Sequence, residues 1–280
     1  MHGKSEIYME TDPDIVIFHA NELVTMNTVY GAPRIGENML DLAIINDGAL
    51  AIKDDRIIFV GTTDELTSKF SLGKVVTKIN ASQKLVTPGF VDPHTHLIFE
   101  GTREEELSKK LIGKSYLEIL NEGGGILKTV RETRNASLEK LVENGKAILN
   151  TMLSYGTTTA EIKSGYGLST ESEIKMLKAA AILKEEHPID IVITFLGAHA
   201  IPLEYKNNPD DYVELIISEM IPKVAKEGIA EFIDVFCEKG VFSIGQTRKI
   251  INTAKVYGLK PQIHIDEIVD SGGALLAAEV

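Results

Sequence analysis

The sequence predicts an α/β protein in which a small β-rich region precedes a parallel sheet built from strand–helix units. Two observations predict it. Residues 14–87 hold short β-type apolar runs separated by turn residues, and from residue 88 the apolar runs alternate with longer helical patterns. The 280 residues, 44% of them hydrophobic and 25% charged, supply enough apolar material for a large core. We therefore expect two domains, residues 1–87 and 88–280.

The N-terminal region is expected to form a small antiparallel sheet or β-sandwich. Valine, isoleucine and phenylalanine gather in short runs, and glycine and acidic residues separate these runs. Asp64-Glu-Leu66 lies in a short helical stretch. The strand-type runs are Ile15–Phe18, Leu50–Ile52, Arg56–Val60 and Val75–Ile79.

From residue 88 the sequence predicts five βα units. The third helix has the clearest signals, because Thr170-x-x-Glu173 matches a capping box and Pro188 follows the helix end. The expected strands are residues 89–92, 157–162, 190–196, 231–236 and 261–265. Helices are expected at about 115–121, 137–155, 171–186, 210–227 and 245–257, with another from near Gly272.

Five βα units do not close a barrel, because a (β/α)₈ barrel typically takes about 250 residues. The region after residue 87 is shorter than that. Either the fold is an open sheet, or the sequence is a fragment of a barrel. The motifs described next favour the fragment, and we expect the first five units of a (β/α)₈ TIM barrel.

The charge and the apolar pattern argue against two classes of partner. The net charge is −12 and no Lys/Arg cluster is dense enough to follow a phosphate backbone, so nucleic acid is not expected as a partner. No apolar run reaches about 18 residues and the polar N-terminus lacks a secretory signal, so we expect no membrane partner and a cytoplasmic location. The one cysteine, Cys237, is interpreted as a buried strand residue.

The most informative motif is Pro88-Gly-Phe-Val-Asp-Pro-His94-Thr-His96. Two histidines two residues apart at a strand end project to the same side, because side chains alternate with a period of two. In a TIM barrel this side is the C-terminal mouth, where active sites are built. Such paired imidazoles suit a divalent metal, with further ligands from later strands. Histidine pairs also arise by chance, but the preceding strand and the Pro-Gly break favour the metal.

Two further expected strands also end in histidine. His264, after the fifth strand, can reach the same mouth as a third ligand, and Glu267 is placed to move protons as a general acid or base. Asp266 is interpreted as an outer or solvated acid. His199, after the third strand, could polarise a substrate carbonyl or complete the metal site. The alternative for His199 is a hydrogen-bonded residue without a role, and the convergence of strand ends favours a function.

Arg103 follows the first expected strand, in a loop that should overhang the mouth. Its guanidinium could bind a substrate carboxylate through two parallel hydrogen bonds. The three glutamates that follow it make a surface ion pair the alternative. Tyr116 and Tyr166 also fall at the mouth side, although single tyrosines are more often packing residues. No role is predicted for His2, His19 or His187.

These motifs resemble imidazolonepropionase, a family of the amidohydrolase superfamily that acts in histidine degradation. The Pro88–His96 element by itself indicates only the superfamily. The segments EIKSGYGL (161–168), FLGAHAIP (195–202) and the loop around Arg103 are similar to this family in particular. The similarity runs from about residue 14 to the end of the sequence.

The resemblance implies a (β/α)₈ barrel beside a small β-sandwich made from both chain ends. It implies a homodimer that hydrolyses the cyclic amide C–N bond of 4-imidazolone-5-propanoate, its small-molecule substrate, to N-formimidoyl-L-glutamate with one zinc or iron ion. The implied metal ligands are His94, His96 and His264. The implied substrate-binding residues are Arg103, Tyr116, Tyr166, His199 and Glu267, of which the last two are also catalytic.

The family's fourth metal ligand is an aspartate of the eighth strand, which lies beyond Val280. We therefore expect a truncated chain that is inactive and weak in metal binding by itself. Two rival functions stay open. A nucleobase-type deaminase has no substrate carboxylate for Arg103 to bind. A non-catalytic amidohydrolase-like scaffold would have lost metal ligands, whereas the three expected histidines are all present.

Overall fold

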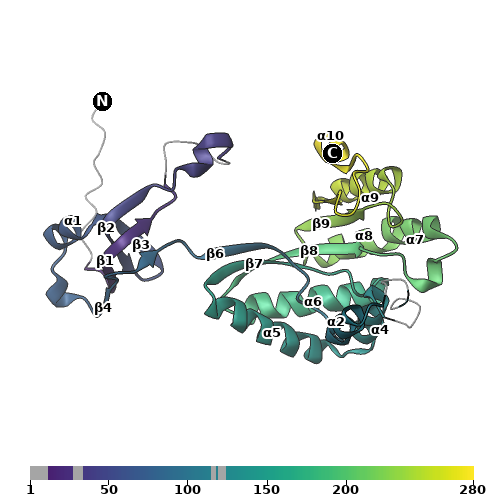
Figure 1. Ribbon diagram of the computed structural model, residues 1–280, viewed down its shortest axis with the longest axis horizontal. Helices are drawn as coiled ribbons and strands as arrows, with labels where there is room; N and C mark the ends of the chain where they lie inside the picture. Colours follow the sequence, from purple (N-terminus) through teal and green to yellow (C-terminus); the bar gives the residue numbers. More distant parts are fainter. Residues whose placement is uncertain (1–11, 28–33, 115–117, 119–123) are drawn as a thin grey trace. The chain divides into compact units, whose positions relative to one another are not determined.

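The computed structural model divides the chain into two units, Met1–Pro88 and Gly89–Val280 (Figure 1). Each unit has its own sheet and its own apolar core, so each is described by itself. The structure describes residues 12–27, 34–114, 118 and 124–280.

The sheet of the first unit is mixed, whereas the sequence predicted antiparallel pairing. β1 is antiparallel to β2 and β2 to β3, but β4 and β5 run parallel to β1. The difference arises because α1 lies between β3 and β4 and returns the chain in the direction of β1. The elements are β1 (Ile15–Val24), β2 (Ile44–Lys53), β3 (Arg56–Thr62), α1 (Thr63–Lys69), β4 (Thr77–Asn80) and β5 (Leu85–Val86), with 3₁₀ turns at Gly36–Leu40 and Leu72–Lys74.

The second unit contains a curled parallel sheet whose strands follow one another in sequence order from β6 to β10 (Figure 1). The fifth expected strand is split into β10 and β11, which pair with β9 at separate points. Pro261 interrupts no hydrogen bond with β9, because the residues on either side of it, Lys260 and Gln262, both donate their N–H groups to β9 or to the residue before it. The strands are β6 (Phe90–Thr95), β7 (Thr157–Lys163), β8 (Asp190–Ala198), β9 (Phe232–Cys237), β10 (Lys260–Pro261) and β11 (His264–Ile265).

The helices of the second unit begin at predictable places. Ser137, Ser169 and Ser243 precede α5, α6 and α9, and each serine side chain accepts a hydrogen bond from a backbone N–H of the first turn. The helices are α2 (Glu104–Leu111), α4 (Ile126–Asn135), α5 (Leu138–Ser154), α6 (Thr170–Glu186), α7 (Pro209–Leu215), α8 (Ile221–Glu227), α9 (Ile244–Val256) and α10 (Gly273–Glu279), with a 3₁₀ turn at Leu203–Tyr205.

Two expectations about these helices are wrong. The capping box at Thr170 and Glu173 does not form, because Ser169 is the N-cap and the Glu173 carboxylate turns toward the preceding loop. The expected helix 210–227 is interrupted by a π-turn at Ile216–Met220. Pro222, just after the turn, has no N–H and its ring crowds the carbonyl four residues earlier, so the helix widens there.

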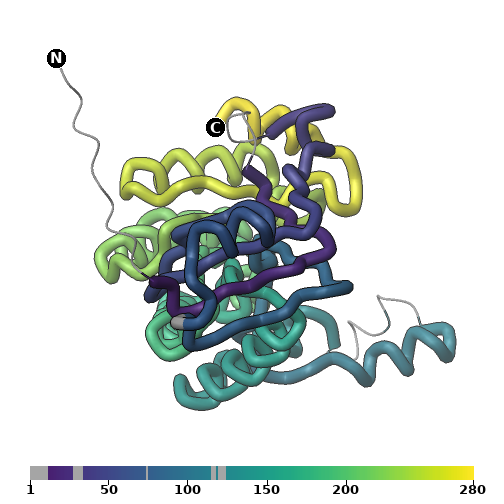
Figure 2. The backbone as a smooth tube through the Cα atoms, turned by 90° about the vertical axis from the view of Figure 1, so that its left-hand side faces the viewer, coloured from purple at the N-terminus to yellow at the C-terminus, as the bar shows by residue number. Residues whose placement is uncertain are grey.

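The region between β6 and α5 was the least well predicted. α2 and α4 were not expected, and the helix expected at about 115–121 lies almost wholly outside the described residues. α2 buries no residue, and Figure 2 shows it extending away from the other helices of its unit. Its sequence, EEELSKKL, is rich in charge and offers only isolated leucines, which explains why an apolar pattern did not reveal it.

The core of the second unit lies between the sheet and the helices that follow its strands. Phe195 of β8, Leu177 of α6 and Tyr212 of α7 are all essentially fully buried. Cys237 is buried at the end of β9, as expected. None of the helices in the described residues combines the length and the apolar character needed to cross a membrane.

Candidate functional site

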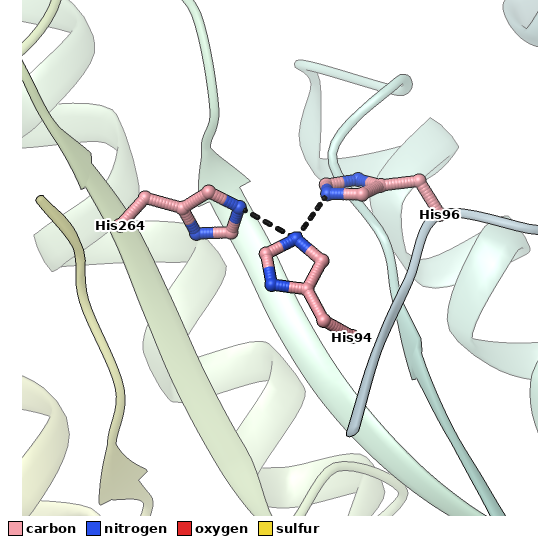
Figure 3. Close-up of side chains that lie close together, drawn as sticks. All are labelled: His94, His96 and His264. Carbon is pink, nitrogen blue, oxygen red and sulfur yellow. Dashed lines mark hydrogen bonds between the residues drawn. The ribbon is translucent and has the colours of Figure 1, made fainter. Parts of the chain in front are cut away.

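Three histidines converge at the carboxyl ends of strands in the second unit. His94 Nε2 lies 2.9 Å from His264 Nε2 and 3.3 Å from His96 Nε2. Figure 3 shows the three rings turned toward one point. Two ligands of a tetrahedral zinc ion, each at 2.0–2.1 Å from it, lie about 3.3 Å apart. The three ring nitrogens, all within 4.8 Å of one another, therefore have the spacing of ligands that share one ion.

The local backbone explains why these side chains meet. His94 and His96 lie at the end of β6 on the same side of the chain, and Thr95 between them points the other way, where its hydroxyl donates to the Glu161 carbonyl at 2.6 Å. His264 opens β11 and pairs with Phe236 of β9. Because all strands of this sheet are parallel, the first and fifth βα units present imidazoles at the same edge.

A buried carboxylate orients the third histidine. Asp234 Oδ2 lies 2.6 Å from His264 Nδ1 and 2.9 Å from Lys163 Nζ, and Asp234 is only 1% exposed. Burial alone would raise the pKa of Asp234, but the bonds to His264 and Lys163 outweigh it and hold that pKa below its usual value. Because a carboxylate only accepts hydrogen bonds, His264 carries a proton on Nδ1, and its Nε2 is left to face the other two rings.

Lys163 is the centre of a buried charge cluster that the sequence analysis missed. Its Nζ lies 2.9 Å from the Glu161 carboxylate and donates to Gln262 Oε1 at 2.7 Å. The Thr194 hydroxyl donates to Glu161 as well. A signal was present, because Glu161 and Lys163 are charged, two residues apart and therefore on the same side of an otherwise apolar strand. The cluster supports Asp234 and so, at one remove, the orientation of His264.

The histidine cluster suits a cation. Burial lowers the pKa of His96 to about 2 and, with the charge of His264, also lowers the pKa of His94. His96 Nδ1 is buried and has no hydrogen-bond partner among the described residues. Neutral imidazoles with unprotonated nitrogens are what a divalent ion requires of its ligands. The residues present therefore fit a bound metal ion.

His199 lies beside this cluster, at the end of β8. Its ring stacks on His96 with centroids 4.7 Å apart, and Tyr166 lies 5.3 Å away on another side. Burial lowers the pKa of His199 to about 4, so the ring is neutral at neutral pH. The Gly165 carbonyl lies 3.0 Å from His199 Nδ1 and can only accept. In the neutral ring, Nδ1 thus carries the proton and Nε2 is an acceptor.

Arg103 lines a separate hollow of about 290 Å³ together with Phe99, Thr129 and Tyr166. It precedes α2, and its charge lowers the pKa of Tyr166, although burial outweighs that effect and leaves the pKa raised. The rings of His96, His199 and Tyr166 connect this hollow with the histidine cluster. Tyr116, the other tyrosine that the sequence pointed to, lies outside the described residues.

Glu267 borders a second hollow of about 440 Å³ that is also lined by His94, Lys163 and His264. It is exposed, at the turn after β11. Asp266 does not face this hollow. Its backbone has a φ of +51°, and its carboxylate accepts hydrogen bonds from the backbone N–H groups of Ser271, Gly273 and Ala274, so it organises the turn.

Curated relatives match nearly all of the chain. An imidazolonepropionase of Alkaliphilus oremlandii (strain OhILAs) is 51% identical over 267 residues, which is 95% of this chain and 63% of the relative. An imidazolonepropionase of Geobacillus kaustophilus (strain HTA426) is 50% identical with the same coverage. The chain thus spans less than two thirds of the length of these relatives. No family model matches it.

Solved structures with the same fold are more distant in sequence. A 5-methylcytosine deaminase from Klebsiella pneumoniae, liganded with phosphonocytosine, has a TM-score of 0.62 and 19% identity, covering 94% of this chain and 55% of that one. The guanine deaminase of E. coli has a TM-score of 0.55 and 18% identity, covering 90% and 54%. At these identities the likeness shows a shared fold and carries no statement about the reaction.

Proposed function

The chain is a relative of the imidazolonepropionases over nearly its whole length, and we propose that the protein it represents hydrolyses the cyclic amide C–N bond of 4-imidazolone-5-propanoate. The product is N-formimidoyl-L-glutamate, an intermediate of histidine degradation. The observation that carries the proposal is the joint geometry of the site. A cluster of three imidazoles and a hollow containing Arg103 are connected through the rings of His199 and Tyr166.

We propose that His94, His96 and His264 hold one divalent ion, zinc or iron. The nitrogen spacing and the lowered pKa values of His94 and His96 support this assignment. A related fold, an atrazine chlorohydrolase from Arthrobacter aurescens TC1 with a TM-score of 0.50 and 14% identity, was solved in complex with zinc. A bound ion of this kind supplies Lewis acidity and lowers the pKa of water. An aspartate from a later strand is expected as a fourth ligand.

We propose that the other residues bind different parts of the substrate. Arg103 binds the propionate carboxylate, and Tyr166 lines the same hollow. Tyr116 is proposed to lie near that carboxylate as well. His199 orients the reacting ring, and its Nε2 can accept a hydrogen bond there. Glu267, beside the histidine cluster, contacts the imidazolone ring and carries a proton to the leaving nitrogen.

The decisive experiment is an assay of the full-length natural protein with 4-imidazolone-5-propanoate, after loading with zinc or with iron under reducing conditions. We expect turnover that a chelator abolishes and metal restores. Release of ammonia from cytosine or guanine, without action on imidazolonepropionate, would contradict the proposal. That alternative is not favoured, because the deaminases that share the fold are no more than 20% identical.

The remaining architecture is also part of the proposal. Residues 1–87 contribute to a composite β-sandwich, and residues 88–280 form the first five units of a (β/α)₈ barrel. The curled parallel sheet in sequence order supports the barrel, because this is how βα units add around its axis. We propose that the complete protein is a cytoplasmic homodimer that acts on a small molecule and binds neither nucleic acid nor membranes.

A further inference from the structure

The loop that joins β7 to α6, residues 164–168, is held by hydrogen bonds on both of its polar edges. We call it the β7–α6 loop. All of its residues are buried except Tyr166. The backbone N–H of Ser164 donates to the carbonyl of Thr194 in β8 at 3.0 Å. A buried loop needs partners for every backbone polar group, and this one finds them in two side chains that the proposed reaction does not use.

Glu173, in the first turn of α6, binds the amide edge of this loop. One carboxylate oxygen accepts from Gly167 N at 2.8 Å and Leu168 N at 2.7 Å, and the other accepts from Gly165 N at 3.0 Å. Glu173 has no exposed surface. Burial raises the pKa of Glu173, while the donated hydrogen bonds favour its ionised form. Ser169 is the N-cap of α6, so Glu173 lies one position beyond the capping-box site, and its carboxylate is directed to the loop instead.

Arg134, at the end of α4, binds the carbonyl edge. Its Nε donates to Gly167 O at 2.6 Å and its Nη2 donates to Leu168 O at 2.9 Å, while Nη1 pairs with Glu204. The planar guanidinium thus spans two consecutive carbonyls in a fixed geometry. Glu173 and Arg134 together bind the N–H and C=O groups of the same two residues, Gly167 and Leu168, and we call them the clamp.

The clamped loop carries two contacts of the candidate site. The Gly165 carbonyl accepts from His199 Nδ1, and Tyr166 packs against the rings of His96 and His199. Gly165 has a φ of +113°, and a Cβ there would lie 2.9 Å from both His199 Nδ1 and Leu196 O. Its backbone therefore touches the imidazole as closely as packing allows, and a small displacement of the loop would change the position of His199.

We propose that Glu173 and Arg134 are positioning residues that fix the β7–α6 loop so that Gly165 holds His199 with its proton on Nδ1. His199 Nε2 is then the ring nitrogen that faces the substrate, and its direction is set by the bond between Nδ1 and Gly165 O. This inference rests on the proposed function for its kinetic part only.

The kinetic test is Glu173→Gln in the full-length, metal-loaded protein. The amide has the same shape but must place an N–H₂ donor against at least one backbone N–H of the loop. We expect kcat to fall by about 10- to 100-fold, as for other outer supports of catalytic groups, with metal content unchanged. Glu171→Gln, an exposed glutamate in the same helix turn, is the matched control and should change kcat less than about twofold.

A double-mutant cycle separates positioning from general damage to the fold. In a His199→Asn background, Glu173→Gln should change kcat by less than about twofold, because the residue through which it acts is gone. An equal loss in both backgrounds would overturn the proposal. Arg134→Lys covers the case in which the glutamine variant does not fold, since lysine keeps the charge but cannot span two carbonyls. It should show the same dependence on His199.

A spectroscopic test needs no substrate. In the zinc-loaded protein labelled with ¹⁵N in its histidine rings, the His199 signals, assigned with His199→Asn, should report a proton on Nδ1. Glu173→Gln should convert them to a mixture of both tautomers. A wild-type proton on Nε2 would overturn the inference whatever the enzyme does. A proton on Nδ1 in a protein that ignores imidazolonepropionate would leave the clamp standing and refute the proposed function.

Discussion

The β7–α6 loop and the segment 264–271 flank the same site but are built in opposite ways. The loop is buried, and the side chains of Glu173 and Arg134 bind both of its backbone edges. The segment contains only a two-residue strand and then an exposed turn. What holds that turn is a pair of carboxylates, Asp266 and Glu238, that accept hydrogen bonds from its own backbone.

The difference separates two kinds of functional side chain. His199, fixed by the loop, sits in a dry and rigid place where its tautomer is determined by a single carbonyl. Glu267, on the exposed turn, keeps contact with water, which suits the proton transfer proposed for it. His264 lies in the segment 264–271, just before the exposed turn. Its ring nevertheless bonds to Asp234, which is buried and paired with Lys163. Substitutions should reveal this division.

The largest effect is expected from Asp234→Asn, which tests whether His264 depends on the buried interior. The amide would present a weaker and ambiguous partner to His264 and leave Lys163 with one carboxylate fewer. We expect metal affinity to fall about 10- to 100-fold, measured by titration of the metal-free protein, together with activity. Asp190→Asn, an exposed aspartate of β8, is the control. Unchanged affinity would mean that the turn alone positions His264.

A smaller loss of activity is expected from Arg103→Met. This variant tests whether the hollow lined by Arg103 and by Tyr166 of the β7–α6 loop binds the substrate carboxylate. Removing one partner of a charge-assisted pair costs about 1.5–3 kcal/mol, so KM for imidazolonepropionate should rise more than about tenfold. Metal content should stay the same, because the histidine cluster lies elsewhere. Arg131→Met, an exposed arginine of α4, is the control. Wild-type kinetics would assign Arg103 to a surface ion pair with its neighbouring glutamates.

In the metal-free protein, the pH dependence of the unfolding free energy should report on the ring of His199. The pKa of His199 is lowered from 6.5 to about 4, so the unfolded chain binds a proton more readily than the folded one between these values. Stability should therefore decrease as pH falls from about 6.5 toward 4, by up to about 1.4 kcal/mol per pH unit for this group.

His199→Asn should make that decrease shallower. Urea unfolding of the variant and the wild type at several pH values measures both slopes. His96, whose pKa is lowered to about 2, contributes in the same direction and stays present in both proteins. Equal slopes in the His199 variant and the wild type would show that this ring is not desolvated in solution.

The smallest effect is expected from Asp266→Ala, which removes the carboxylate that organises the exposed turn. Loss of such backbone-capping bonds costs about 0.5–2 kcal/mol of unfolding free energy. Asp266→Asn should retain most of the stability, because asparagine keeps an acceptor and tolerates the positive φ of this position. A drop beyond that range, or a loss of bound metal, would show that the turn supports the site more strongly than its exposure suggests.

The sequence predicted the parallel sheet and the convergence of the strand-end histidines well. Both depend on short-range patterns: apolar runs that alternate with helical periodicity, and the period-two placement of His94 and His96 on a strand. The split of the fifth strand was missed, because it depends on where the chain pairs with β9 in space. The π-turn before Pro222 was missed, because it depends on how the proline ring meets the preceding helical turn. α2 was missed because charge conceals its pattern.

The supports of the site were harder to predict than the site itself. Glu173 matched a helix cap in sequence, and only the folded loop offered it three better donors. Asp234 and Lys163 lie on different strands, 71 positions apart by their residue numbers, and their pairing depends on the register of the sheet. Sequence patterns locate residues at strand ends, whereas pairing between strands is a property of the assembled sheet.

The sequential strand order has a consequence for how the protein is made. Each strand of the second unit pairs with the one before it, so βα units can dock one after another as the chain leaves the ribosome. His94 and His96 are then in place early, but His264 is 170 residues after His94 and arrives with the fifth unit. The proposed metal site is therefore completed only when the fifth unit docks, after the strands that carry Lys163 and Asp234 have been made.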